Sequence, residues 1–266
     1  MSKLKPARIW CIIGVLSLVL LAQGVAWGTS ITVGNANFSS PAVSAGGNST
    51  DSAPPWNGQG AIWGVYNPSG TGAFATAVTV PGGTGAQVGF ANDTGTGSLF
   101  QELTTGPNNT LAANTTYTLT VYVGWRQDTN NNNDPLDSIS LDVYSGSGSV
   151  SSASSYVRLA SIGEAGSFEP GSDNTTSTWT ALTRAFFTEE TLTFTTGASP
   201  TDLGDTLAIF LNTSATSGAQ GDFADVGLTE VSTVSAVPLP AAAWLLGFGL
   251  LGLVALGRRK RTDFGA

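Results

Sequence analysis

The sequence predicts an all-β domain, an antiparallel sandwich of two sheets, flanked by one apolar segment at each end of the chain. Two observations predict the sheets. Short runs with apolar residues at alternate positions recur through residues 29–231, and segments rich in Gly, Ser, Thr and Asn separate them. No stretch between the terminal segments keeps a 3.6-residue apolar period, as an amphipathic helix would.

The clearest predicted strand is Thr115–Trp125, in which apolar side chains at every second position alternate with threonines and a tyrosine. Roughly ten further runs of this kind fit the size and spacing of one β-sandwich domain over residues 29–231. They are Ala61–Tyr66, Phe74–Val80, Ala86–Phe90, Ser98–Leu103, Ser138–Tyr144, Tyr156–Ser161, Thr178–Phe187, Leu192–Thr195, Thr206–Asn212 and Phe223–Val231.

The N-terminal segment has the form of a secretory signal peptide over residues 1–28. Three cations, Lys3, Lys5 and Arg8, precede the apolar run Ile9–Leu21, and small residues follow it. The single cysteine lies inside this run, so the exported chain is expected to hold neither a disulfide nor a reactive thiol.

The C-terminal segment predicts a membrane-spanning helix over residues 241–257, after a tether at residues 232–236. Two prolines, Pro238 and Pro240, prevent a helix from starting earlier. The apolar run Ala241–Leu256 would span about 24 Å as a helix, close to the thickness of a hydrocarbon core. The basic cluster that follows should remain cytoplasmic, which leaves the preceding domain outside; it consists of Arg258, Arg259, Lys260 and Arg261.

This tail resembles the PEP-CTERM sorting signal of Gram-negative bacteria, in its VPLPA variant, over residues 237–261. Leu239 stands where the more common form has a glutamate. The resemblance implies cleavage near the motif by a partner enzyme, an exosortase, and delivery to the cell surface or the exopolysaccharide matrix. The motif residues are Val237, Pro238, Leu239, Pro240 and Ala241.

A second resemblance concerns the exported part, which is similar to galactose-binding-like jelly rolls of carbohydrate-binding modules. It is carried by the segments Val33–Phe38, Leu99–Leu103, Thr110–Arg126 and Asp222–Leu228. The resemblance implies a jelly-roll form of the sandwich.

In such modules a structural calcium ion often ties the first strand to the last. The resemblance would place this ion at Asn37 and Asp225, with Asn35 and Asp222 as alternatives. Ser39 replaces the glutamate that usually follows the opening phenylalanine, which weakens the site. Calcium is the only cofactor that the sequence suggests.

The charge of the exported part excludes nucleic acid as a partner. Residues 28–257 contain three arginines, no lysine and 17 of the 18 acidic residues, which gives a net charge of −14. Binding to phosphates requires a basic surface, which this composition does not offer.

The composition also restricts catalysis. The chain contains no histidine, and its only cysteine is in the signal segment, so nucleophilic triads and His-ligated zinc are excluded. A carboxylate pair acting on a polysaccharide is the enzymatic alternative, but most acids lie in polar loops. The remaining candidate carboxylates for such a pair are Glu102, Glu169, Glu189 and Glu190.

The sequence therefore predicts a non-catalytic protein with a structural or adhesive role in the matrix and weak glycan binding. Aromatic faces next to polar groups are what sugar binding would need. The residues considered for such contacts are Trp56, Trp63, Tyr66 and Arg126, with Trp56 expected in an exposed turn.

Overall fold

The computed structural model describes residues 28–60, 62–75, 79–82, 86–92, 96–128, 137–144, 156–163, 179–214, 220–232 and 248–249. Residues 26–233 form one compact unit. The elements described in this unit are all strands. They are β1 (Thr29–Ile31), β2 (Asn48–Thr50), β3 (Asn57–Gln59), β4 (Ile62–Tyr66), β5 (Val88–Asn92), β6 (Thr96–Glu102), β7 (Thr115–Trp125), β8 (Ser138–Tyr144), β9 (Tyr156–Gly163), β10 (Phe187–Thr195), β11 (Thr206–Ser214) and β12 (Gln220–Ser232).

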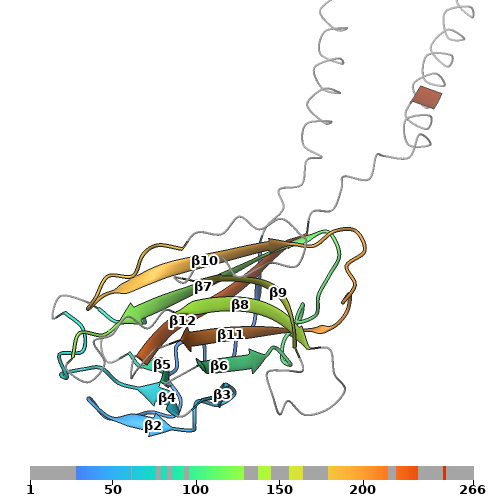
Figure 1. Ribbon diagram of the computed structural model, residues 1–266. Helices are drawn as coiled ribbons and strands as arrows, with labels where there is room; N and C mark the ends of the chain where they lie inside the picture. The colour runs from blue at the N-terminus through green and yellow to red at the C-terminus, as the bar shows by residue number, and fades with distance from the viewer. Residues whose placement is uncertain are drawn as a thin grey trace, which may run out of the picture. The chain divides into compact units, whose positions relative to one another are not determined.

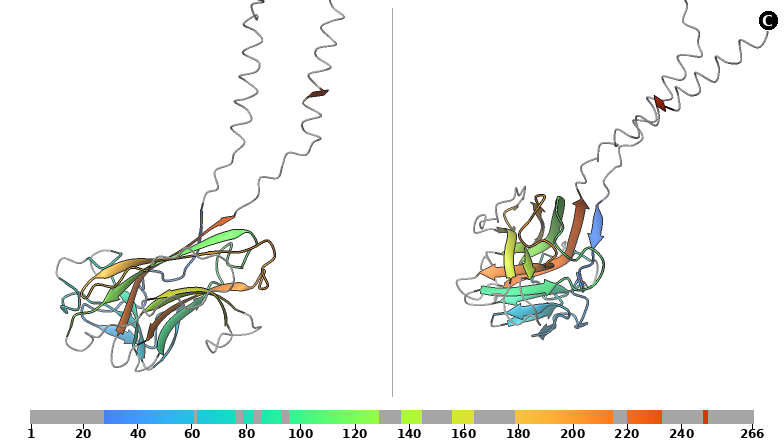
Figure 2. Two further views of the ribbon diagram at one scale, coloured as in Figure 1. Left: turned by 45° about the horizontal axis from the view of Figure 1, so that its top comes forward. Right: turned by 90° about the vertical axis from the view of Figure 1, so that its right-hand side faces the viewer.

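The strands form two antiparallel sheets (Figures 1 and 2). A seven-stranded sheet has the order β10-β7-β12-β5-β4-β2, with β1 paired to β12 beside this path. A five-stranded sheet has the order β3-β6-β11-β8-β9. Apart from the pairs β4-β5 and β8-β9, the paired strands are not consecutive in the chain, so each sheet face combines residues from distant parts of the sequence.

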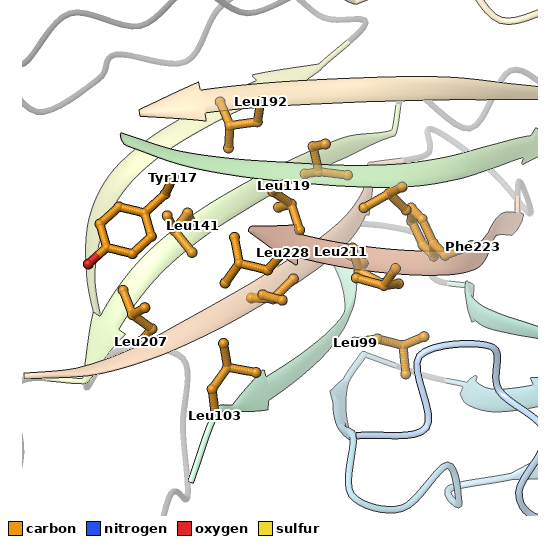
Figure 3. Close-up of a cluster of buried hydrophobic side chains, with 14 of the residues drawn as sticks. Leu99, Leu103, Tyr117, Leu119, Leu141, Leu192, Leu207, Leu211, Phe223 and Leu228 are labelled. Atoms are coloured by element: carbon orange, nitrogen blue, oxygen red, sulfur yellow. The ribbon is translucent and has the colours of Figure 1, made fainter. Parts of the chain in front are cut away.

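A continuous hydrophobic core lies between the two sheets. In Figure 3, Leu119, Leu192 and Leu228 of the seven-stranded sheet lie close to leucines of the five-stranded sheet. Alternation along each strand directs one set of side chains into this core and the other set outward. Strand β7 follows the rule over most of its predicted length, since Tyr117 and Leu119 are fully buried in the core while Thr116 and Thr118 face outward.

The prediction of an all-β domain with antiparallel sheets is confirmed for the described residues of 28–232. Two of the predicted strands are wrong. Phe74 and Ala75 lie in a loop, and residues 179–186 precede β10, which begins only at Phe187. Their apolar side chains are buried without belonging to a strand, since Leu182 packs in the main core and Phe74 packs in a second hydrophobic cluster with Tyr66 and Phe90.

The predicted signal peptide and sorting signal lie outside the described residues, apart from Gly28, Phe248 and Gly249, the last two of which are helical. Within the part of the chain that the structure describes, none of the helices has the length and apolar character needed to cross a membrane.

Candidate functional site

The outward face of the five-stranded sheet brings together residues from four of its strands. Phe210 of β11 lies directly opposite Phe100 of β6, and Tyr144 of β8 lies opposite Tyr156 of β9. Phe210 points away from the core because its neighbours along β11, Ile209 and Leu211, point into it.

An aromatic cluster forms the centre of this face. Phe100 and Phe210 stack with ring centroids 5.1 Å apart and an angle of 10° between their planes. Tyr156 packs edge-on against Phe210 at 4.9 Å, and Tyr144 lies 5.3 Å from Tyr156. Ala208, a small residue on the same face of β11, is fully buried beside these larger side chains.

One carboxylate, Asp142 of β8, lies next to the aromatic cluster. Its partner on β9 is Arg158, whose Nε lies 3.5 Å from Oδ1 of Asp142. A shift of register between Leu141 and Asp142 accounts for this pairing, because Leu141 lies opposite Ala160 while Asp142 lies opposite Arg158. The additional residue in β9, Leu159, forms a β-bulge, and this bulge changes the direction in which the side chain of Arg158 points.

The two charges of this pair differ strongly in burial. The Asp142 side chain is 4% exposed, whereas that of Arg158 is 41% exposed. Burial raises the pKa of Asp142 to about 6, although the nearby Arg158 opposes this change. A carboxyl with this pKa is protonated in part of the molecules near neutral pH, so it can donate a proton.

A second carboxylate on this face, Glu102, lies at the end of β6 beside the hydroxyl of Tyr156. Burial raises the pKa of Glu102, and burial together with the nearby Glu102 charge raises the pKa of Tyr156. Tyr156 therefore keeps its hydroxyl proton at physiological pH.

A pocket of about 370 Å³ opens on this face. Its volume lies within the range typical of small-molecule sites. It combines the carboxylate, the arginine and two aromatic rings with amide and hydroxyl groups. The lining residues are Gln59, Gly97, Ser98, Asp142, Tyr156, Arg158, Phe210 and Asn212.

Another buried carboxyl, Asp222 of β12, has its pKa raised to about 7, first of all by burial. It lies on the outward face of the other sheet, where its side chain is fully buried. Asp142 lines its pocket, whereas Asp222 is not among the residues that line the pocket near it. The face around Asp142 is therefore the better candidate for chemistry on a bound molecule.

Two of the sequence-predicted ligand residues, Trp56 and Trp63, belong to the core side of the structure. Trp56 is 2% exposed, packs 5.2 Å from Phe38, and donates its indole N–H to the carbonyl of Asn35. The expectation of an exposed Trp56 was wrong, because this turn folds back onto the core. Trp63 also packs against the core between the sheets.

The other two, Tyr66 and Arg126, lie together on the outward face of the seven-stranded sheet. The guanidinium carbon of Arg126 lies 4.4 Å from the centroid of the Tyr66 ring. Arg126 also forms an ion pair with Asp128. These two residues line a different pocket from that of Asp142.

The predicted calcium ligands Asn37 and Asp225 come from neighbouring backbone segments, since the amide of Val226 donates to the carbonyl of Ala36 over 3.0 Å. Both side chains are exposed. In the described residues no group of three or more acidic, cysteine or histidine side chains is placed to hold a metal ion. Calcium binding at this place stays a prediction.

The sequence alone did not predict four of these site residues, Asp142, Arg158, Tyr156 and Phe210. One signal was present: the run Leu207-Ala-Ile-Phe-Leu211 is apolar at every position, so one of its faces must place apolar side chains outside the core. Those side chains, Ala208 and Phe210, are themselves buried, in the aromatic cluster on the outward face.

Comparison with known proteins identifies the class of this chain. Residues 29–229 match the HpiC1-like family, described as HpiC1 cyclase. Because the match extends over most of the chain, the protein belongs to the HpiC1-like family. A comparison with curated protein sequences finds no significant match.

Solved cyclase structures share the fold. A cyclase from Fischerella sp., in its apo form, is 21% identical over 77% of this chain and 97% of its own, with a TM-score of 0.56. A Stig cyclase, Fisc, from Fischerella sp. TAU in complex with (3Z)-3-(1-methyl-2-pyrrolidinylidene)-3H-indole is 20% identical over 77% and 99%, with a TM-score of 0.56. A cyclase from Fischerella sp. TAU in complex with 4-(1H-Indol-3-yl)butan-2-one is 20% identical over 77% and 98%, with a TM-score of 0.57.

The family match overturns the functional prediction. The expected non-catalytic role, structural or adhesive with weak glycan binding, was wrong, because the matching family is that of a cyclase. The same finding contradicts the alternative prediction of an enzyme that acts on a polysaccharide, because the family is one of cyclases. Most acidic residues lie in polar loops of the sequence, but Asp142 lies within strand β8, where the other strands of the sheet bury it. The sorting signal at residues 237–261 lies outside the matched residues and stays a prediction.

Proposed function

We propose that this protein is a cyclase that closes a ring in a small aromatic molecule bound on the outward face of the five-stranded sheet. The observation that carries this proposal is the position of Asp142, a buried carboxyl of raised pKa that lines an aromatic-walled pocket. Membership of a cyclase family supports the reaction type. The jelly-roll, galactose-binding-like form of the sandwich is part of the same proposal.

The chemistry assigned to Asp142 is general acid catalysis. The Oδ–H bond of the protonated carboxyl breaks as the proton passes to a basic atom or a polarised double bond of the substrate, which makes the adjoining carbon electrophilic. A second double bond of the same molecule attacks this carbon, and the ring bond forms. The product then returns a proton to the carboxylate, so the overall reaction is an isomerisation.

The groups around Asp142 support this role. Arg158 stabilises the carboxylate that remains after proton transfer, since its charge lies 3.5 Å away. The ring of Tyr156, which packs against the buried Phe210, offers an aromatic surface for such a substrate. The fold relatives bind compounds with an indole or indole-type ring, and we propose a substrate with a ring system of this kind.

A binding experiment and a kinetic experiment test the proposal. The compound 4-(1H-Indol-3-yl)butan-2-one should perturb the side-chain amide signals of Gln59 and Asn212, both of which line the pocket. Replacement of Asp142 by asparagine keeps the shape but removes the acid, and should lower the rate of ring closure about 100-fold or more. Glu189→Gln, an exposed carboxylate on the other sheet, is the matched control. An Asp142→Asn variant with the wild-type rate would refute the assignment.

A further inference from the structure

The pocket beside Asp142 has one cationic side chain among its lining residues, Arg158 of β9. This side chain is 41% exposed, so a molecule bound in the pocket can reach its guanidinium. The nitrogen that lies 3.5 Å from the Asp142 carboxylate is Nε. The other two nitrogens, Nη1 and Nη2, carry the remaining N–H donors of the guanidinium in the same plane.

The two other arginines of residues 28–257 lie elsewhere and have partners of their own. Arg126 is 7% exposed and forms an ion pair with Asp128. Arg184 is exposed and donates to a backbone carbonyl over 2.9 Å. Neither of them lines the pocket of the proposed reaction. Of the three, Arg158 is therefore the arginine that a molecule in this pocket would meet.

The net charge of the pocket depends on the protonation of Asp142. The proposed reaction uses Asp142 as an acid, and a protonated carboxyl group is neutral. In that state Arg158 carries the one remaining charge of the lining, because the other lining residues are Gln, Gly, Ser, Tyr, Phe and Asn. The state of the pocket that can donate a proton is therefore positively charged and favours an anionic ligand over a neutral or cationic one.

The neighbouring strands supply one further charged group. Ala208 of β11 lies on the other side of Asp142 from Arg158, and Glu102 of β6 lies beyond Ala208. Glu102 does not line the pocket, and burial raises its pKa. Tyr156 and Tyr144 are the titratable groups of the aromatic cluster on this face. Among the described strands, Arg158 is thus the charged group that both adjoins Asp142 and lines the pocket.

We propose that the molecule cyclised in this pocket carries a carboxylate, which the terminal nitrogens of Arg158 bind while Nε stays beside Asp142. This inference rests on the proposed function, because it takes Asp142 in its protonated state. A carboxylate is planar and accepts two parallel hydrogen bonds from a guanidinium. Its single negative charge also balances that of Arg158. The carboxylate takes no part in the bond changes of ring closure, so its role is to hold and orient the substrate.

A bound carboxylate also favours the acid form of Asp142. Burial raises the pKa of Asp142 to about 6, and a second negative charge nearby raises it further. Binding of the carboxylate is therefore linked to uptake of a proton, and its affinity should decrease at least about threefold between about pH 6 and about pH 8. Asp142→Asn should remove this pH dependence; its persistence in that variant would overturn the link to Asp142.

Three indole compounds with similar side chains test the inference. They are 4-(1H-Indol-3-yl)butan-2-one, indole-3-propionate and tryptamine, which end in a neutral ketone, a carboxylate and an ammonium group. Calorimetric titration at about pH 6 should give indole-3-propionate an affinity at least about fivefold higher than that of the other two, the size expected for an ion pair that solvent partly screens. An equal or lower affinity would overturn the carboxylate assignment.

Arg158→Gln removes the guanidinium and should lower the affinity for indole-3-propionate at least about fivefold, while the affinity for the ketone stays within about twofold. Arg184→Gln changes the net charge equally and removes an exposed arginine that does not line the pocket, so it is the matched control. Unchanged binding in Arg158→Gln would overturn the proposal. An equal loss in both variants would assign the preference to the overall charge of the protein and would also overturn it.

The side-chain amide signals of Gln59 and Asn212 distinguish the failure of this inference from the failure of the proposed function. Both residues line the pocket, so a compound bound there should shift their signals in the wild-type protein, whether or not Arg158→Gln folds. If the ketone shifts them and indole-3-propionate binds no more tightly, the carboxylate is refuted and the cyclase site stands. If none of the three compounds shifts them, both proposals are refuted.

Discussion

Arg158 lies directly across the strand pair from Asp142, and its Nε is 3.5 Å from the Asp142 carboxylate. Arg158 lowers the pKa that burial raises in Asp142. Burial of Asp142 and the charge of Arg158 therefore together set the fraction of Asp142 that is protonated at a given pH. The roles of both residues can be tested by measuring how the reaction rate depends on pH.

Replacement of Arg158 by glutamine should raise the pKa of Asp142 above about 6, because a favourable charge is removed from the carboxylate. The alkaline limb of the pH–rate profile should move to higher pH, while turnover at pH 7 stays within about threefold of wild type since Arg158 is partly screened by solvent. Arg184→Gln, which changes another exposed arginine, is the control. A limb that moves to lower pH would contradict the assigned interaction.

The wild-type enzyme should lose activity as the pH rises through about 6. Asp142 must be protonated to donate, and its pKa is raised to about 6, so the active fraction decreases about tenfold for each pH unit well above this value. Measurement of kcat/KM between about pH 5 and pH 8 tests this prediction. The residual activity of Asp142→Asn should lack the limb; persistence of the same limb in that variant would assign it to another group.

The stability of the fold should decrease as the pH rises from about 4 to about 7. Asp222 has a folded-state pKa of about 7 and an ordinary value of 3.8, so between these values the folded state binds a proton that the unfolded state lacks. The slope of unfolding free energy against pH is therefore negative in this window, and the stability lost is on the order of 4 kcal/mol. Above about pH 7 this contribution is constant.

Urea denaturation at about pH 5 and about pH 8 can measure this effect. The Asp222→Asn variant should lose less stability between the two pH values than the wild type. Asp142 changes stability in the same direction in both proteins, so it cancels from the comparison. An identical loss in both proteins would show that Asp222 ionises in the folded state as it does in the unfolded state.

Gly64→Ala should destabilise the fold by about 2 kcal/mol or more. Gly64 has φ of +150°, and a Cβ at this position would overlap the carbonyl oxygen of Ser49 on the paired strand β2. The substitution must therefore displace β2 from β4. Gly197→Ala is the matched control, since a Cβ there meets nothing within 4 Å. Equal urea midpoints for the two variants would contradict the close approach of these strands.

Much of the fold could be predicted from alternation along the chain. The boundaries of Thr115–Trp125 and Ser138–Tyr144 agree between prediction and structure, because one face of each strand is apolar and buried. The strands β1, β2 and β3 were missed, since three residues are too few to show a period.

The candidate site could not be predicted in the same way. Its residues come from Gln59 to Asn212 and become neighbours only through the order β3-β6-β11-β8-β9. The bulge that places Arg158 opposite Asp142 leaves no local signal in the sequence, since it depends on how two strands pair.

The sequence by itself determined the class of the fold, the antiparallel pairing of its strands and the absence of histidine from the chain. These follow from local periodicity and from composition, which need no knowledge of distant contacts. The tertiary structure decided which carboxyl is chemically useful, because the pKa of Asp142 depends on burial by strands that are far away in the chain. Burial, unlike alternation, is a property of the packed molecule.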